Sequence, residues 1–180
     1  MEKQIELQGC HGTSISRSLL IQLNGFKKAE GRLGTGVYFW RDGFHAKNLA
    51  YGWWSYQLSE KCFVTDKNSN ACIIWVKIGI GEEEFLDITS PEINEGFAQL
   101  CSKLQLKYDA SKKQLAKAMT MFIDNLEKEL NCKFKIVESM VAPPPKGFVP
   151  DYPIKALGAP RCYIVYDETC ITISKVDVCS

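Results

Sequence analysis

The sequence lacks several features that would place it in a common class of protein. It has no stretch near the roughly 18 consecutive apolar residues that a membrane-spanning helix needs. The formal net charge is +1, so no strong overall field draws the chain to nucleic acid or to a membrane surface. The first residues, Met1 to Glu6, are mostly charged or polar and do not resemble a signal peptide. We therefore expect a cytoplasmic protein without a membrane partner.

Metal-binding and disulfide patterns are also missing, although the chain has eight cysteines. None is spaced as CxxC, and scattered cysteines in a cytoplasmic chain usually act as small buried apolar residues. A zinc site drawn from Cys10, His11, His45 and Cys62 would need ligand spacings that the sequence does not have. We expect no metal.

What is present indicates one globular domain over residues 1–180. The chain is 46% hydrophobic and 24% charged, and no repeat or low-complexity tract divides it. Periodicity predicts strands at 5–11, 37–40, 71–80, 84–88, 134–137, 162–167 and 170–174, and helices at 16–23, 44–58, 91–106 and 111–130. Because the helices interleave with strands without a regular βαβ rhythm, the pattern favours an α+β domain with a mixed or antiparallel sheet.

Three short segments suggest chemistry when they are taken together. They are Cys10-His11-Gly12-Thr13-Ser14, then Gly34-Thr35-Gly36-Val37-Tyr38-Phe39, and late in the chain Tyr163-Ile164-Val165-Tyr166-Asp167. Each segment is ambiguous by itself. For example, a dinucleotide-binding glycine loop follows a strand, whereas the loop with Gly34 and Gly36 precedes one. In this order and spacing, the sequence resembles the ADP-ribosyltransferases of the poly(ADP-ribose) polymerase and diphtheria-toxin type.

This resemblance implies a split β-sandwich core with peripheral helices and NAD as the substrate in an extended cleft. It implies that His11 binds a ribose hydroxyl on the adenosine side, helped by Thr13 unless Thr13 only caps a helix. The Gly12 peptide would hold the nicotinamide carboxamide, and Tyr51 would stack on the nicotinamide ring. The implied NAD-binding residues are His11, Gly12, Thr13, Tyr38, Phe39, Asn48 and Tyr51, and the implied catalytic positions are His11, Tyr38 and Cys162.

One position departs from the family pattern. The catalytic glutamate of the family immediately precedes the Tyr-x-Val-Tyr-Asp stretch, where this chain has Cys162. Arg161 and Tyr163 point to the opposite face of the strand, so neither replaces it. The other carboxylates that could approach are Asp151, Glu138 and Glu168, and the acceptor itself could assist. We therefore expect a mono-ADP-ribosyltransferase, with a catalytically inactive NAD- or ADP-ribose-binding module as the alternative.

The acceptor is expected to be a macromolecule, with nucleic acid such as RNA favoured over protein. Residues 101–136 hold eight lysines against four acidic residues, which indicates either a solvated helix face or a docking face for phosphates. Trp53, Trp54 and Tyr56 could add stacking surfaces. The proline-rich stretch 143–160 lies where the family has its acceptor-recognising loop. Stand-alone transferases of this kind resemble bacterial toxins of toxin–antitoxin and phage-defence systems, which implies an antitoxin protein as partner.

Overall fold

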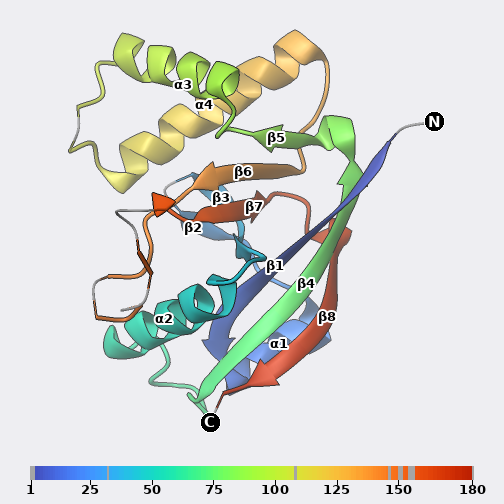
Figure 1. The fold of residues 1–180 in the computed structure, drawn as a ribbon, viewed down its shortest axis with the longest axis vertical. Coiled ribbons are helices and arrows are strands. Elements are labelled where there is room, and N and C mark those ends of the chain that lie inside the picture. Colours follow the sequence, from blue (N-terminus) through green and yellow to red (C-terminus); the bar gives the residue numbers. More distant parts are fainter. Residues whose placement is uncertain are drawn as a thin grey trace.

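A computed structural model describes residues 3–31, 33–107, 109–145, 147–149, 152–153 and 157–179. Helices and strands interleave along the chain, as the periodicity predicts (Figure 1). The helices are α1 (Ile15–Asn24), α2 (Ala46–Ser59), α3 (Pro91–Lys103) and α4 (Lys112–Leu130), with short 3-10 turns η1 (Glu82–Glu84) and η2 (Glu168–Cys170). The strands are β1 (Gln4–Ser14), β2 (Ala29–Gly31), β3 (Gly34–Arg41), β4 (Ala71–Gly81), β5 (Phe85–Asp87), β6 (Ile136–Met140), β7 (Arg161–Val165) and β8 (Ile171–Val178).

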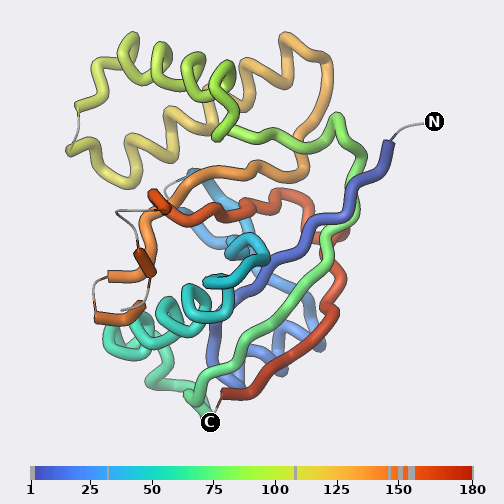
Figure 2. Tube along the Cα trace, viewed as in Figure 1, coloured from blue at the N-terminus to red at the C-terminus, as the bar shows by residue number. Residues whose placement is uncertain are grey.

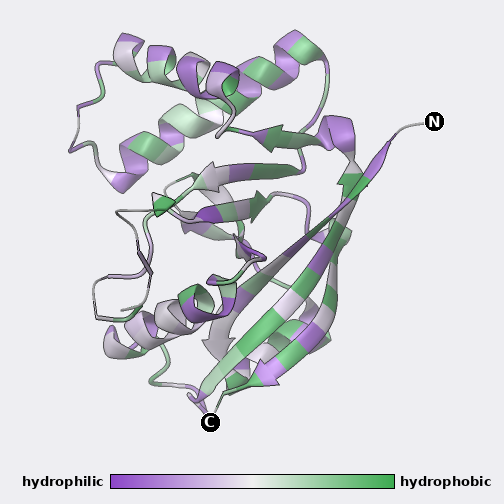
Figure 3. Ribbon diagram, in the orientation of Figure 1, coloured by the Kyte–Doolittle hydropathy of each residue, from purple (hydrophilic) through white to green (hydrophobic). Residues whose placement is uncertain are grey.

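The described strands form one mixed sheet in the order β5-β6-β7-β3-β1-β4-β8, and β2 pairs with β3 beside it. Only β5 and β6 run parallel; the other pairs are antiparallel. Figure 2 shows strands distant in the sequence side by side, with β4 between β1 and β8. The expected α+β class is therefore confirmed, and β4, the most apolar predicted strand, is interior to the sheet (Figure 3).

The sheet has a weak point in its middle. β1 and β3 are joined, within the described residues, only by the pairs Gly9–Arg41 and Cys10–Trp40. This short ladder divides the sheet into a β5-β6-β7-β3 half and a β1-β4-β8 half. The two expected sheets are thus one continuous sheet that is nearly divided. The halves share a core, because Phe39 and Val165 of one half cluster with Ile74 and Ile78 of the other.

Helices cover the sheet on both sides. α3 and α4 bury Met119, Phe122 and Ile123 against β5, β6 and β7, and Figure 3 shows the alternation of hydrophilic and hydrophobic residues along α4. α2 packs on the β1–β3 junction through Ala46, Leu49 and Ala50. No helix in the described ranges has both the length and the apolar character to cross a membrane.

Helix α1 forms where the apolar spacing predicts a helix, but its three leucines point outward while Ile21 packs against the core. Leu19, Leu20 and Leu23 are 61%, 58% and 79% exposed. The buried residue of this helix is Ser18, whose hydroxyl donates to the Ile15 carbonyl at 2.8 Å. Hydrogen bonding within the helix satisfies the serine and lets it face the sheet at low cost.

Candidate functional site at the split between β1 and β3

The split begins beside Gly12 of β1, a buried residue. Asp42 N–H donates to the Gln8 carbonyl at 2.9 Å, so the even-numbered residues of β1 direct their peptide groups toward β3. Gly12 has the same parity, but the described β1–β3 ladder stops at Cys10. The N–H and C=O of Gly12 therefore point into the split, where they offer a donor and an acceptor on one residue.

His11 explains why the ladder stops. Its Nδ1 lies 3.1 Å from the carbonyl oxygen of Tyr38, which is the group that would face Gly12 if the β1–β3 register continued. A carbonyl only accepts, so Nδ1 carries the hydrogen in this contact. The side chain of His11 thus takes the partner that the Gly12 N–H would otherwise use.

The His11 ring is held in place and kept neutral. It packs edge-on against Phe26 and Phe39, with ring centroids 5.7 and 6.1 Å away. Burial lowers the pKa of His11 below its ordinary value of 6.5, and the contact with the Tyr38 carbonyl opposes this only in part. With the hydrogen on Nδ1, Nε2 is an acceptor; it has no partner among the described residues and reaches the molecular surface. A ligand hydroxyl is a suitable donor to it.

Gly12 is also the closest approach of α2 to the sheet. A Cβ built on Gly12 would lie 1.8 Å from the carbonyl oxygen of Ala50. Any other residue would therefore push α2 away from β1. The glycine allows this packing on one side, and its peptide points toward β3 on the other.

The β1–α1 junction after Gly12 is fixed by polar contacts. Thr13 is buried, and Ser14 rather than Thr13 caps α1, accepting from the Arg17 N–H at 3.1 Å. The Ser14 hydroxyl also donates to Asp66, and Arg17 pairs with the same carboxylate at 3.2 Å. These bonds anchor the loop after α2 to the end of β1, which holds the Gly12 edge in a fixed position.

Tyr38 organises the β2–β3 turn. Its hydroxyl donates to the Gly34 carbonyl at 2.8 Å and accepts from the Leu33 N–H at 3.3 Å. The hydroxyl of Tyr166 donates to the Leu33 carbonyl at 3.1 Å, so two tyrosines hold one turn. Burial raises the pKa of Tyr38 to about 12. Its phenol therefore stays protonated at neutral pH and acts by position rather than as a base.

The remaining predicted NAD-binding residues lie in contrasting environments. Phe39 is fully buried in the core beneath His11, so its contribution is to support the imidazole. Asn48 is exposed on α2. Tyr51 is 43% exposed on the same helix and packs its ring 5.0 Å from that of Trp54. α2 thus carries two polar side chains that are free to reach a ligand beside the split.

Cys162 lies on β7 opposite Trp40 and is only 3% exposed. It clusters with Cys10, Ala46 and Leu49 beneath α2. Burial raises the pKa of the Cys162 thiol far above its ordinary value, so the group is neutral at physiological pH. It supplies no negative charge to a cationic intermediate.

Strand register separates the predicted catalytic residues. Cys10 pairs with Trp40, and Trp40 with Cys162, so these side chains and that of Tyr38 share one face of the sheet. His11 belongs to the other face with Phe39. The two sets therefore lie on opposite faces of the sheet at the split.

The carboxylates considered as replacements for the missing glutamate are held elsewhere. Glu138 pairs in register with Tyr163, on the face opposite Cys162, and its Oε1 accepts from Arg41 at 2.8 Å and Arg161 at 3.2 Å. Glu168 forms an ion pair with Lys28 at 2.7 Å. Asp151 lies outside the described residues. No sequence pattern indicated the Arg41–Glu138–Arg161 cluster, which forms only through the register of three strands.

Neither a scan against models of protein families nor a search of curated proteins returns a match to this chain. Its function is therefore inferred from these residues and their geometry.

Proposed function

We propose that this protein is an NAD-dependent mono-ADP-ribosyltransferase that cleaves the bond between nicotinamide and ribose and transfers ADP-ribose to a macromolecule. The observation that carries the proposal is the Gly12 peptide, which points toward β3 beyond the last described β1–β3 pair. A primary carboxamide has one acceptor oxygen and an N–H donor side by side, which matches the N–H and C=O of a single strand residue. The nicotinamide end of NAD carries such a group.

The neighbouring residues suit the rest of NAD. The Nε2 of His11 is an acceptor for a ribose hydroxyl, since its Nδ1 is occupied by Tyr38. Tyr51 offers an exposed ring for stacking beside the Gly12 edge, because the preceding residue, Ala50, touches Gly12. When nicotinamide leaves, the ribose carbon becomes cationic, so a site that fixes both ends and limits water access lowers the barrier.

The neutral Cys162 limits the chemistry. A thiol held uncharged by burial neither stabilises the cation nor takes a proton from an acceptor hydroxyl. Chain extension needs an activated ribose hydroxyl of the previous unit, so we propose single-unit transfer rather than synthesis of poly(ADP-ribose).

The test uses labelled NAD, a whole-cell lysate and two substitutions of His11. His11→Asn can keep the bond to the Tyr38 carbonyl but has no group at the Nε2 position, whereas His11→Gln places an amide oxygen near that position. Loss of one such hydrogen bond is expected to weaken NAD binding about two- to tenfold, and more for Asn than for Gln. Equal losses in both variants would show that His11 acts through packing alone.

Digestion of the labelled lysate identifies the acceptor class. Label removed only by nuclease indicates a nucleic acid, and label removed only by protease indicates a protein. No label above that of a His11→Ala, Tyr38→Ala double variant would refute transfer. Growth arrest on expression in a bacterial host, relieved by His11→Asn, would support the toxin role and antitoxin partner that the family resemblance implies.

A second candidate is a non-catalytic module that binds NAD or ADP-ribose. The buried, neutral Cys162 favours it, because the position that carries a glutamate in active relatives is here part of the apolar packing under α2. NAD would then raise the melting temperature, as a ligand specific to the folded state must, without release of nicotinamide. Nicotinamide release by the wild-type protein and not by the double variant would exclude this candidate.

A further inference from the structure

One end of the α3–α4 hairpin carries positive charge that the fold leaves unpaired. Lys133 pairs with Glu127, and Lys135 pairs with Glu84 at 2.7 Å. In contrast, five exposed lysines between the last turn of α3 and the second turn of α4 make no ion pair with any described residue; they are Lys103, Lys107, Lys112, Lys113 and Lys117. The sequence from 103 to 117 contains a single carboxylate, Asp109. We call these five residues the basic end.

A seam of aromatic side chains lies along α2. Residues 147–149 and 152–153, from the described part of the proline-rich stretch, form a strap against this helix. A Cβ on Gly52 would lie 2.1 Å from Val149, so the strap touches the helix backbone. Phe148 packs 5.6 Å from Tyr56 near one end of the contact.

The other end of the seam presents an accessible ring. Tyr152 of the strap packs 5.2 Å from His45, and His45 packs 4.9 Å from Phe44. Phe44 is 93% exposed. A phenylalanine in a turn with almost its whole side chain in water contributes little to folding, because the burial that stabilises a core is absent. Its ring is available to a ligand.

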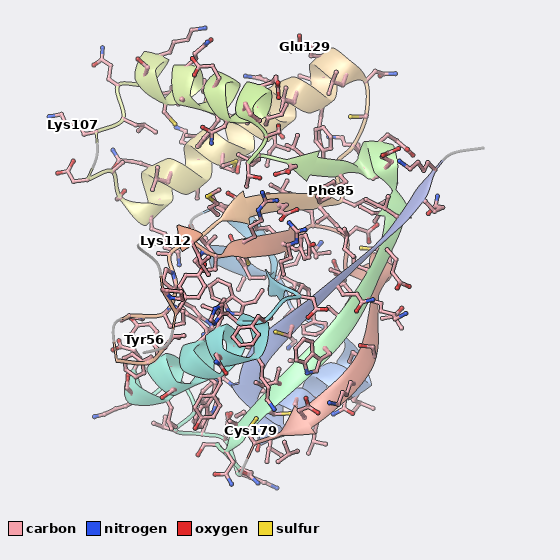
Figure 4. The ribbon with its side chains drawn as sticks, viewed as in Figure 1. Tyr56, Phe85, Lys107, Lys112, Glu129 and Cys179 are labelled. Atoms are coloured by element: carbon pink, nitrogen blue, oxygen red, sulfur yellow. The ribbon has the colours of Figure 1, made fainter. Side chains whose placement is uncertain are left out.

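The basic end lies on the same side of the view as the last turns of α2, and α2 runs from there to the middle of the view, where it begins (Figure 1). Figure 4 shows Lys107, Lys112 and Tyr56 one below another along the left side of the view. α2 also packs on Gly12, so the seam lies beside the split that we assign to NAD. A long ligand that runs from the basic end along α2 would pass the proposed reaction centre.

We propose that the basic end and the aromatic seam together bind single-stranded nucleic acid as the acceptor of the transferase, an inference that rests on the proposed function. The lysines contact backbone phosphates, and Phe44 with its neighbours stacks on bases. An acidic peptide would use the lysines but gain little from the rings. A duplex would hide its base faces, so unpaired bases are required.

The transfer step balances without a general base. A lone pair on a nucleobase nitrogen forms the bond to the anomeric carbon of the ribose next to nicotinamide. The bond from that carbon to the nicotinamide nitrogen breaks, and its electron pair leaves with neutral nicotinamide. The positive charge passes to the base, which releases an amine proton to water. The neutral Cys162 is compatible with this route, since no proton has to be removed before the bond forms.

Fluorescence anisotropy with labelled single-stranded oligonucleotides of about 12 nucleotides, a length that covers several stacking positions, tests the proposal. Phe44→Ala is expected to weaken binding roughly five- to a hundredfold, and Phe44→Trp to restore it. The triple variant Lys107→Gln, Lys112→Gln, Lys113→Gln is expected to lower the slope of log affinity against log salt by about 2. The matched control, Lys27→Gln, Lys67→Gln, Lys77→Gln, removes the same charge from other elements.

The binding experiment is repeated with four ligands: single-stranded RNA, single-stranded DNA, a duplex and a polyglutamate peptide. Binding of RNA or DNA that depends on Phe44 supports the proposal. The nucleic acid that binds more tightly is then assigned as the acceptor. Equal binding of duplex and single strand, an effect of Phe44→Ala on the peptide equal to that on the oligonucleotide, or equal salt slopes in the two triple variants would overturn it. The thermal shift with NAD is measured on every variant. Its absence in the wild type refutes the proposed function, whereas its presence with no oligonucleotide binding refutes only the acceptor assignment.

Discussion

Gly12→Ala is the substitution for which the structure gives the most definite cost. The new Cβ would lie 1.8 Å from the Ala50 carbonyl oxygen, and ordinary contact begins at 3.4 Å, so α2 would have to retreat by about 1.6 Å. Both contacting groups belong to backbone and cannot rotate away. Overpacking costs about 1–3 kcal/mol, and we expect the upper end here, about 3 kcal/mol, because Leu49 and Ala50 would leave their packing with Cys10.

For a chain of this size, each kcal/mol changes the melting temperature by about 2–4 °C, so a loss of roughly 6–12 °C is expected. Differential scanning calorimetry measures it. Gly79→Ala is the matched control, since Gly79 lies on β4 of the same sheet with nothing within 4 Å of its Cβ position. Ala50→Gly should not rescue Gly12→Ala, because the obstructing carbonyl remains. Equal melting temperatures for Gly12→Ala and Gly79→Ala would refute the close approach of α2.

Three further predictions concern the side chains around the split. Burial lowers the pKa of His11 below 6.5, so on acidification the unfolded chain binds a proton that the folded chain does not. The free energy of unfolding should therefore fall as pH drops below about 6.5. Urea unfolding at about pH 7.5 and about pH 5.5 should show a smaller loss of this free energy for His11→Asn than for wild type. Cys162→Ala should leave nicotinamide release within about twofold of wild type, because a neutral thiol takes no part in it; loss of release without loss of stability would contradict this. Tyr166→Phe removes the hydrogen bond to the Leu33 carbonyl. It should lower the free energy of unfolding in urea by about 1 kcal/mol and speed amide exchange at Leu33. Unchanged exchange would mean that Tyr38 alone holds the turn.

Most of the secondary structure was predictable because periodicity reports it directly. The strand at 71–80 and the helix at 111–130 appear within one or two residues of their predicted bounds, as β4 and α4. Periodicity also identified the residues of α1 that share a face, but it does not say which face turns inward. Leu19, Leu20 and Leu23 share a face and lie in water, whereas Ser18 is buried.

The sequence did not predict which distant strands pair or in which register. Glu138 was considered as a substitute acid from its position in the chain alone. Its true surroundings depend on the register of β3, β6 and β7, which brings Arg41 and Arg161 to it on the face away from Cys162. The same limit applies to the lysines of residues 101–136, because Lys133 pairs with Glu127 of the same stretch whereas Lys135 pairs with Glu84 of η1.

Gly12 shows how one residue can require glycine for more than one reason. From the family resemblance, the glycine is expected because a ligand approaches its peptide. In the structure, the direction that a side chain would take is already filled by the Ala50 carbonyl. Its peptide lies beyond the described β1–β3 ladder, where the His11 ring contacts the Tyr38 carbonyl. The two adjacent residues therefore act as a unit: removing the imidazole bond would let β1 and β3 pair one step further, and that pairing would close the donor and acceptor that we assign to nicotinamide.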